Sequence, residues 1–186
     1  WFEQRIERLA NSKIPQKIKV GKMSAKVKRK NPDAMKQRLG VLREIATNEV
    51  ALGFPKGKAQ AYSGNEHPGF EEEGPQEVAT VAAKNEYGIG VPRRPFMSAS
   101  RNQIESECTP IMKAMGRTGV SVKAALNLMK ASGEKGKSVI QKKIIDFSTP
   151  PNSPKTIALK GESNPLVWTG HMVRSTTYVV RKKGRS

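Results

Sequence analysis

Two stretches of the chain are expected to be β-strands: the first alternates apolar and polar residues, and the second contains a short apolar run. One covers 49–54 and the other about 175–181. The apolar positions of the first are Val50, Leu52 and Phe54, and the second contains Tyr178, Val179 and Val180. Further strands are compatible with the sequence within 18–28 and 58–70. The chain therefore contains sheet, with strands that lie far apart in sequence.

Elsewhere apolar residues recur every three or four positions, as on one side of a helix. These rows are Met35, Leu39, Leu42 and Ile45; Ile104, Cys108, Ile111, Met112 and Met115; Val122, Ala125, Leu126 and Met129; and Ile140, Ile144 and Phe147. A shorter helix is expected from Pro75 to about Tyr87. Gly133 and Gly136 separate the last two rows, and we expect them to loosen or kink the helix there.

Strands so far apart must pair across the helices between them. The economical solution is an α+β domain, a small antiparallel or mixed sheet packed with several helices. We assign it to residues 46–186. Residues 1–45 are expected to form a basic N-terminal arm with some helix, because lysines dominate and apolar residues are few.

The net charge of the chain indicates which kinds of partner to expect. The formal net charge is +18, and residues 1–45 hold 13 basic and 4 acidic side chains, whereas residues 46–76 hold 2 and 5. A surface this basic repels itself unless a polyanion or an acidic protein neutralises it. No apolar run approaches the roughly 20 residues that span a bilayer, so no membrane partner is expected. Cys108 is the sole cysteine, which excludes a disulfide framework and favours a reducing compartment.

The sequence offers little catalytic chemistry. No metal-binding pattern surrounds either histidine, and no His, Lys and carboxylate set converges on a candidate active site. Glu71, Glu72 and Glu73 lie in a stretch rich in glycine and proline. Three adjacent carboxylates are more often a solvated or subunit-facing patch than a metal site. We therefore expect no catalytic residues, no metal and no cofactor.

Two segments are candidates for contact with other subunits. In Val91-Pro92-Arg93-Arg94-Pro95-Phe96 the prolines keep the backbone extended, Pro95 can open a helix and Phe96 can anchor it. Arg93 and Arg94 either line a solvated turn or meet carboxylates of the next subunit, for which Arg suits bidentate geometry. The basic tail Arg181, Lys182 and Lys183, with Lys26, Lys28, Arg29 and Lys30 in the arm, is the candidate for contact with DNA phosphates.

The other candidate segment lies near the end of the chain. A proline-stiffened stretch from Pro150 to Gly161, expected to be non-helical, precedes Asn164-Pro165-Leu166-Val167-Trp168-Thr169-Gly170-His171-Met172. Asn164-Pro165 is expected to open a short helix, and Thr169-Gly170 to interrupt the chain before the final strand. Leu166, Val167 and Met172 can simply complete the core. Trp168, with His171 near it, is the candidate interface anchor, because Trp is enriched at interface centres.

Three pieces of the chain together resemble the tail-completion, or neck, proteins of tailed bacteriophages, which include virion-morphogenesis and minor-tail-component families. They are Ala82-Ala83-Lys84-Asn85-Glu86-Tyr87-Gly88, then Val91-Pro92-Arg93-Arg94-Pro95-Phe96-Met97, then the Pro150–Met172 segment closed by Ser175. Together they cover about residues 46–181. Two positions depart from the family pattern, since Trp168 stands where Asp is common and Met172 where Leu is common.

The resemblance implies a structural virion protein without enzymatic activity, assembled in the host cytoplasm. It implies a ring of several copies at the head-tail junction or the head-proximal end of the tail, in contact with connector, neck and tail proteins. The expected fold is a sheet flanked by helices. The alternative from charge alone is a sequence-nonspecific nucleic-acid-binding protein.

Overall fold

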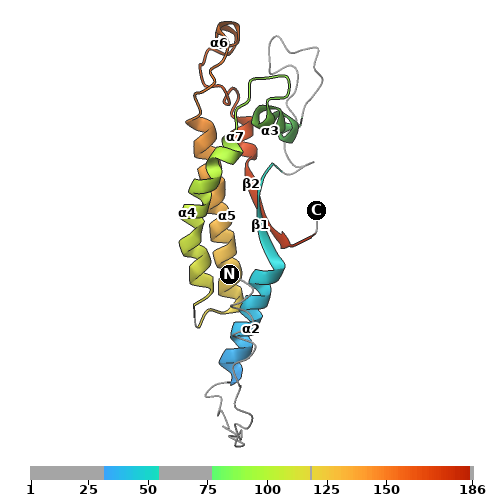
Figure 1. The fold of residues 1–186 in the computed structure, drawn as a ribbon, viewed down its shortest axis with the longest axis vertical. Helices are drawn as coiled ribbons and strands as arrows, with labels where there is room; N and C mark the ends of the chain where they lie inside the picture. The colour runs from blue at the N-terminus through green and yellow to red at the C-terminus, as the bar shows by residue number, and fades with distance from the viewer. Residues whose placement is uncertain (1–31, 55–76, 118, 185–186) are drawn as a thin grey trace, which may run out of the picture. The chain divides into compact units, whose positions relative to one another are not determined.

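A computed structural model of the chain describes residues 32–54, 77–117 and 119–184 (Figure 1). Residues Asp33–Ser186 form one compact unit. Its elements, in order, are α2 (Pro32–Thr47), β1 (Asn48–Gly53), α3 (Val78–Tyr87), α4 (Phe96–Met115), α5 (Val122–Ile145), α6 (Pro154–Lys160), α7 (His171–Ser175) and β2 (Thr177–Lys182). The described residues thus form six helices and one two-stranded sheet, which confirms the α+β class.

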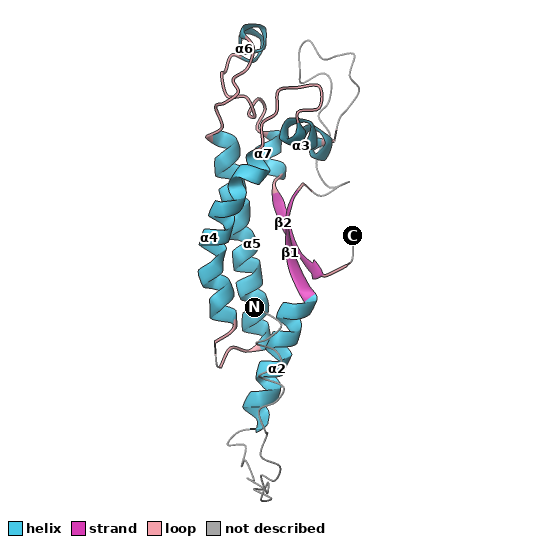
Figure 2. Ribbon diagram, in the orientation of Figure 1, coloured by secondary structure: helices cyan, strands magenta, loops and turns pink. Residues whose placement is uncertain are grey.

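The sheet consists of the two strands that the sequence predicted (Figure 2). β1 and β2 are antiparallel, and their register runs from Asn48 opposite Lys182 to Gly53 opposite Thr177. Both strands pack against α5. Leu52 and Tyr178 are direct cross-strand partners, and both touch this helix. The possible strands within 18–28 and 58–70 lie outside the described residues.

We expected Gly133 and Gly136 to loosen or kink the helix, and α5 continues through both without interruption. α5 is a continuous helix of 24 residues, and Gly133 and Gly136 are buried within it. A Cβ atom at Gly133 would lie 2.2 Å from the Tyr178 ring, and one at Gly136 would lie 2.6 Å from a methyl group of Leu52. Glycine at these two positions therefore allows close packing of the sheet on the helix.

α4 and α5 lie side by side as a helical hairpin (Figure 1). The Ser121 hydroxyl caps α5 by accepting a hydrogen bond from the Ala124 amide at 3.1 Å. Met115, Ala125 and Met129 are buried at the predicted positions. Met112 was expected on the same buried side, but its side chain is 42% exposed.

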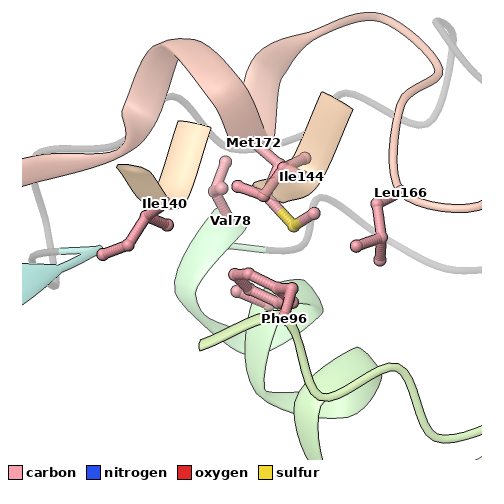
Figure 3. Packing of buried hydrophobic residues seen from close by; sticks show 7 residues of the cluster. Val78, Phe96, Ile140, Ile144, Leu166 and Met172 are labelled. Atoms are coloured by element: carbon pink, nitrogen blue, oxygen red, sulfur yellow. The ribbon is translucent and has the colours of Figure 1, made fainter. Parts of the chain in front are cut away.

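The main core cluster lies where α3, the start of α4 and the end of α5 meet the segment leading into α7 (Figure 3). Its members are Val78, Ala82, Phe96, Ile140, Ile144, Leu166 and Met172. Phe96 is fully buried and makes an edge-to-face contact with Phe54, with ring centroids 6.2 Å apart. The core therefore joins parts of all three family-like segments.

The C-terminal segment differs from expectation in two places. The stretch expected to be non-helical contains α6, because Pro154 occupies its first turn, where proline is tolerated, and the Ser153 hydroxyl accepts from the Thr156 amide at 3.1 Å. The short helix expected at Asn164-Pro165 is absent from this described segment. The chain instead turns there and enters α7 after Gly170.

The helix predicted around Met35–Ile45 is present as α2. It runs directly into β1, and the compact unit begins at Asp33. Its apolar side, however, is not buried. Met35, Leu39 and Leu42 are each about half exposed, whereas Val41, on the other side, is 3% exposed. None of the described helices is long and apolar enough to cross a membrane.

Candidate interaction site

The end of α3 is a tight turn that only glycine fits well. Gly88 has a φ of 76°, in the left-handed region, and its amide donates to the Lys84 carbonyl at 2.8 Å. The Ile89 amide donates to the same carbonyl at 2.9 Å. A Cβ at Gly88 would lie 2.9 Å from the Cβ of Arg93. The turn thus brings the chain after α3 directly against the start of the Arg93-Arg94 segment.

Glu86 joins this turn to the start of α4. Its side chain is 6% exposed, and its carboxylate accepts hydrogen bonds from the backbone amides of Met97 at 2.8 Å and Ser98 at 3.1 Å, and from the Ser98 hydroxyl. The first amides of a helix have no partner within the helix, and a negative charge there also complements the helix dipole. Glu86 therefore caps α4 from the end of a different helix.

Arg94 is buried at the centre of the site, with 6% of its surface exposed. Its guanidinium donates to side-chain oxygens of Asn85 at 3.1 Å and Asn152 at 3.2 Å, and to the carbonyl of Pro150 at 3.3 Å. The Arg94 amide also donates to the Asn85 carbonyl at 2.7 Å. These partners are neutral, and burial lowers the pKa of the guanidinium. We call Asn85, Glu86, Arg94 and Asn152 the Arg94 cluster.

Asn152 extends this cluster to the last family-like segment. Its amide group donates to the carbonyl of Asn164 at 3.1 Å. The Asn164 side chain in turn accepts from the amides of Leu166 at 2.9 Å and Val167 at 2.8 Å, and donates to the Ile145 carbonyl at 2.6 Å. Segments far apart in sequence are thus held together by one chain of buried or half-buried polar contacts.

The same contacts hold a loop that exposes apolar side chains. Tyr87 is 70% exposed, Ile89 59% and Val91 36%. Gly90, between them, has a φ of 71°. The loop is anchored at one end by the Lys84 carbonyl and at the other by the Arg94 cluster. We call Tyr87, Ile89 and Val91 the apolar loop; it is a projecting hydrophobic surface whose backbone is already fixed.

Trp168 belongs to a second, smaller group of contacts, which involves Lys160 of α6. The Lys160 ammonium sits 5.9 Å from the Trp168 ring centroid and donates to the Asn164 carbonyl at 2.7 Å. Burial lowers the pKa of Lys160, and the positive charge of Arg94 lowers it further. Trp168 and His171 are partly buried. Leu159 on α6 is 44% exposed.

The predicted site residues other than Trp168 and His171 separate into three groups. Phe96 is buried and packs on Phe54, as expected of an anchor for the start of α4, so it is not exposed for contact with a neighbouring subunit. Arg94 is also buried, which corrects both the solvated turn and the subunit contact considered for it; Arg93 is exposed. Arg181, Lys182 and Lys183 are exposed, and the Arg181 guanidinium pairs with the Glu49 carboxylate across the sheet at 2.8 Å. The remaining predicted residues, Glu71, Glu72, Glu73, Lys26, Lys28, Arg29 and Lys30, lie outside the described residues.

Sequence reasoning missed the apolar loop and the role of Glu86. The available signal was the alternation Tyr87-Gly88-Ile89-Gly90-Val91, in which glycines separate large apolar residues. Among the described residues no group of three or more His, Cys, Asp or Glu side chains could hold a metal ion. The site consists of hydrogen bonds that fix the backbone and of apolar side chains that are exposed.

Comparison of the chain with protein-family models, with curated proteins and with solved structures found no match.

Proposed function

We propose that the protein is a structural component of a tailed-phage virion, at the head-tail junction or the head-proximal end of the tail. Several copies form a ring there and contact the connector, neck and tail proteins. The proposal rests on the resemblance of three ordered segments to tail-completion proteins. It is supported by the meeting of those segments at the Arg94 cluster.

The observation that carries an assembly role is the apolar loop. Large apolar side chains on a fixed backbone lose little conformational freedom when a partner covers them, so they contribute strongly to binding. Tyr is also among the residues enriched at the energetic centre of interfaces. A ring requires a head-to-tail contact in which this surface meets a different surface on the next copy.

The polar groups of the Arg94 cluster support a non-enzymatic role. Arg94 and Asn152 direct their side-chain groups to partners within the fold, and the Glu86 carboxylate is bound to the start of α4. A catalytic group would have to face a substrate. In this cluster the polar groups instead fix the loop, which is what a binding surface requires.

The proposal is tested by the mass of the protein in solution. Native mass spectrometry and light scattering, over a range of protein and salt concentrations, should show a discrete oligomer, or a monomer that becomes a ring when its phage connector is added. The double variant Tyr87→Ser/Ile89→Ser should stay folded and lose the ring. Ile145→Ser/Leu159→Ser is the matched control, because those side chains are also exposed, at 54% and 44%.

Arg93→Ala and Trp168→Ala test the remaining predicted interface residues. An Arg94 change is unsuitable because it would disturb the fold. The same experiment with duplex DNA separates the alternative function. A complex that weakens steeply with salt, without any defined protein oligomer, would replace the ring proposal with nonspecific nucleic-acid binding.

A further inference from the structure

α2 carries a row of apolar residues that the described fold leaves about half exposed, although Leu42 also lines a small pocket with Met115. Met35 is 50% exposed, Leu39 54% and Leu42 48%, and Ala46 is also exposed. These residues are spaced four, three and four positions apart, so they form a single narrow line along the helix. We call Met35, Leu39, Leu42 and Ala46 the α2 seam. This spacing is that of the apolar line through which two helices pair.

The opposite side of α2 is attached to the rest of the protein. Val41 is buried, and a Cβ at Gly40 would lie 3.3 Å from the Val122 side chain at the start of α5. α2 also continues directly into β1. α2 is a helix of 16 residues that is joined to the compact unit at its C-terminal end and along one side. The α2 seam lies on its other side.

The borders of the α2 seam carry only positive charge. Arg38 lies along one border, and Lys36 and Arg43 lie along the other, and all three are exposed. The acidic residues of the helix, Asp33 and Glu44, fall on the opposite side, since Glu44 follows Met35 by nine residues, or two and a half turns. Charges at these border positions determine which helix pairs with which.

We propose that the α2 seam binds an amphipathic helix of another protein, whose own apolar line is bordered by Asp or Glu. A second α2 does not suit the surface, because either orientation would bring Lys36, Arg38 and Arg43 against the same basic residues. A lipid surface does not suit it either, because lipid-binding helices present a wider apolar face. This surface is separate from the apolar loop, so the inference does not depend on ring assembly.

A designed peptide provides the probe. It has four heptads with Ile and Leu at the core positions and Glu at both borders; its counterpart differs only by Lys in place of Glu. Fluorescence anisotropy of the labelled peptides, titrated with the full chain at low salt, should show binding of the Glu peptide. The Lys peptide should bind at least about tenfold more weakly, because like charges then face each other.

Two variants of the chain test the geometry. Leu39→Asn/Leu42→Asn should weaken binding of the Glu peptide by about tenfold or more, because both side chains lie in the contact. Lys36→Glu/Arg43→Glu should reverse the preference in favour of the Lys peptide. Ile145→Asn is the matched control, since Ile145 is 54% exposed on another helix, and it should leave both affinities unchanged.

The inference is overturned by any of four results. Neither peptide binds; the Lys peptide binds the unaltered chain as well as the Glu peptide does; sedimentation shows a dimer that Leu39→Asn/Leu42→Asn abolishes; or anionic vesicles bind the chain with the same dependence on those leucines. Loss of the ring in Tyr87→Ser/Ile89→Ser, with peptide binding intact, would show that the two surfaces act separately and would support the inference.

Discussion

Replacing Gly133 with alanine tests whether the close contact between α5 and β2 governs the packing of the sheet. Alanine stabilises an exposed helix interior by about 1 kcal/mol relative to glycine, so helix propensity alone predicts a gain. The structure instead predicts that the substitution lowers the free energy of unfolding. An added Cβ at Gly133 would lie 2.2, 2.6 and 2.7 Å from three atoms of the Tyr178 ring.

The identity of those atoms determines how large the loss should be. One of them is Cγ, the ring atom bonded to the Tyr178 Cβ, so the ring cannot avoid the new methyl group by a small rotation. β2 would have to move away from the helix. Overpacking of this kind costs about 1–3 kcal/mol, so after the propensity gain of about 1 kcal/mol we expect the free energy of unfolding to fall by up to about 2 kcal/mol. At Gly136 the nearest atom is a terminal methyl of Leu52, at 2.6 Å, which can turn aside, so Gly136→Ala should cost less.

Urea denaturation followed by circular dichroism measures these differences. Ala131→Gly is the matched control, because Ala131 is exposed on the same helix and its replacement reports helix propensity alone. It should lower the free energy of unfolding by about 1 kcal/mol. If Gly133→Ala raises stability by about as much as Ala131→Gly lowers it, the close contact does not govern this site and the reasoning is refuted.

Three further predictions concern the polar contacts. Glu86→Ala should lower the free energy of unfolding by about 1–3 kcal/mol in a urea titration, because two backbone amides at the start of α4 lose their acceptor; unchanged stability would show that water replaces the carboxylate. Arg94→Lys should cost about 3 kcal/mol in the same assay, because a single ammonium cannot reach the oxygens that the guanidinium fork contacts, and a near-neutral result would mean that the cluster does not hold the segments together. Burial raises the pKa of the Cys108 thiol, so its reaction with a disulfide reagent should accelerate at a higher pH in the folded protein than in the urea-unfolded one; the reverse order of the two pH profiles would contradict the described environment.

β1 and the long helices could be predicted because each leaves a local period in the sequence, and β2 because it contains a short apolar run. Val50 and Leu52 alternate, and Met115, Ala125 and Met129 recur at helical spacing, so no knowledge of partners was needed. A local period does not show which element, if any, packs on the apolar side of a helix. The periodicity of Met35, Leu39 and Leu42 identified a helix correctly, but it could not show that this side faces outward and that Val41 faces inward.

Contacts between distant residues explain the other differences. Arg94 and Asn152 are 58 positions apart, and nothing local marks them as partners, so a solvated turn or a subunit contact was the natural expectation for an arginine between prolines. Gly133 is a similar case. Glycine is required at this position because of Tyr178, which lies on a strand more than 40 positions later. In each case the missing information was which element packs against which.

The positions of these residues distinguish those that stabilise the fold from those that are exposed and available to contact a partner. Asn85, Glu86 and Arg94, which carry much of the phage-like pattern, are engaged within the protein, and substituting them would first disturb its folding. Ile89 and Leu39 contribute little to the described core, yet they are exposed on backbone that is already ordered. A sequence resemblance carried by the first group therefore bears mainly on the scaffold. Under the two proposals made above, the choice of binding partner depends on the apolar loop and the α2 seam, where substitutions should change binding while leaving stability nearly intact.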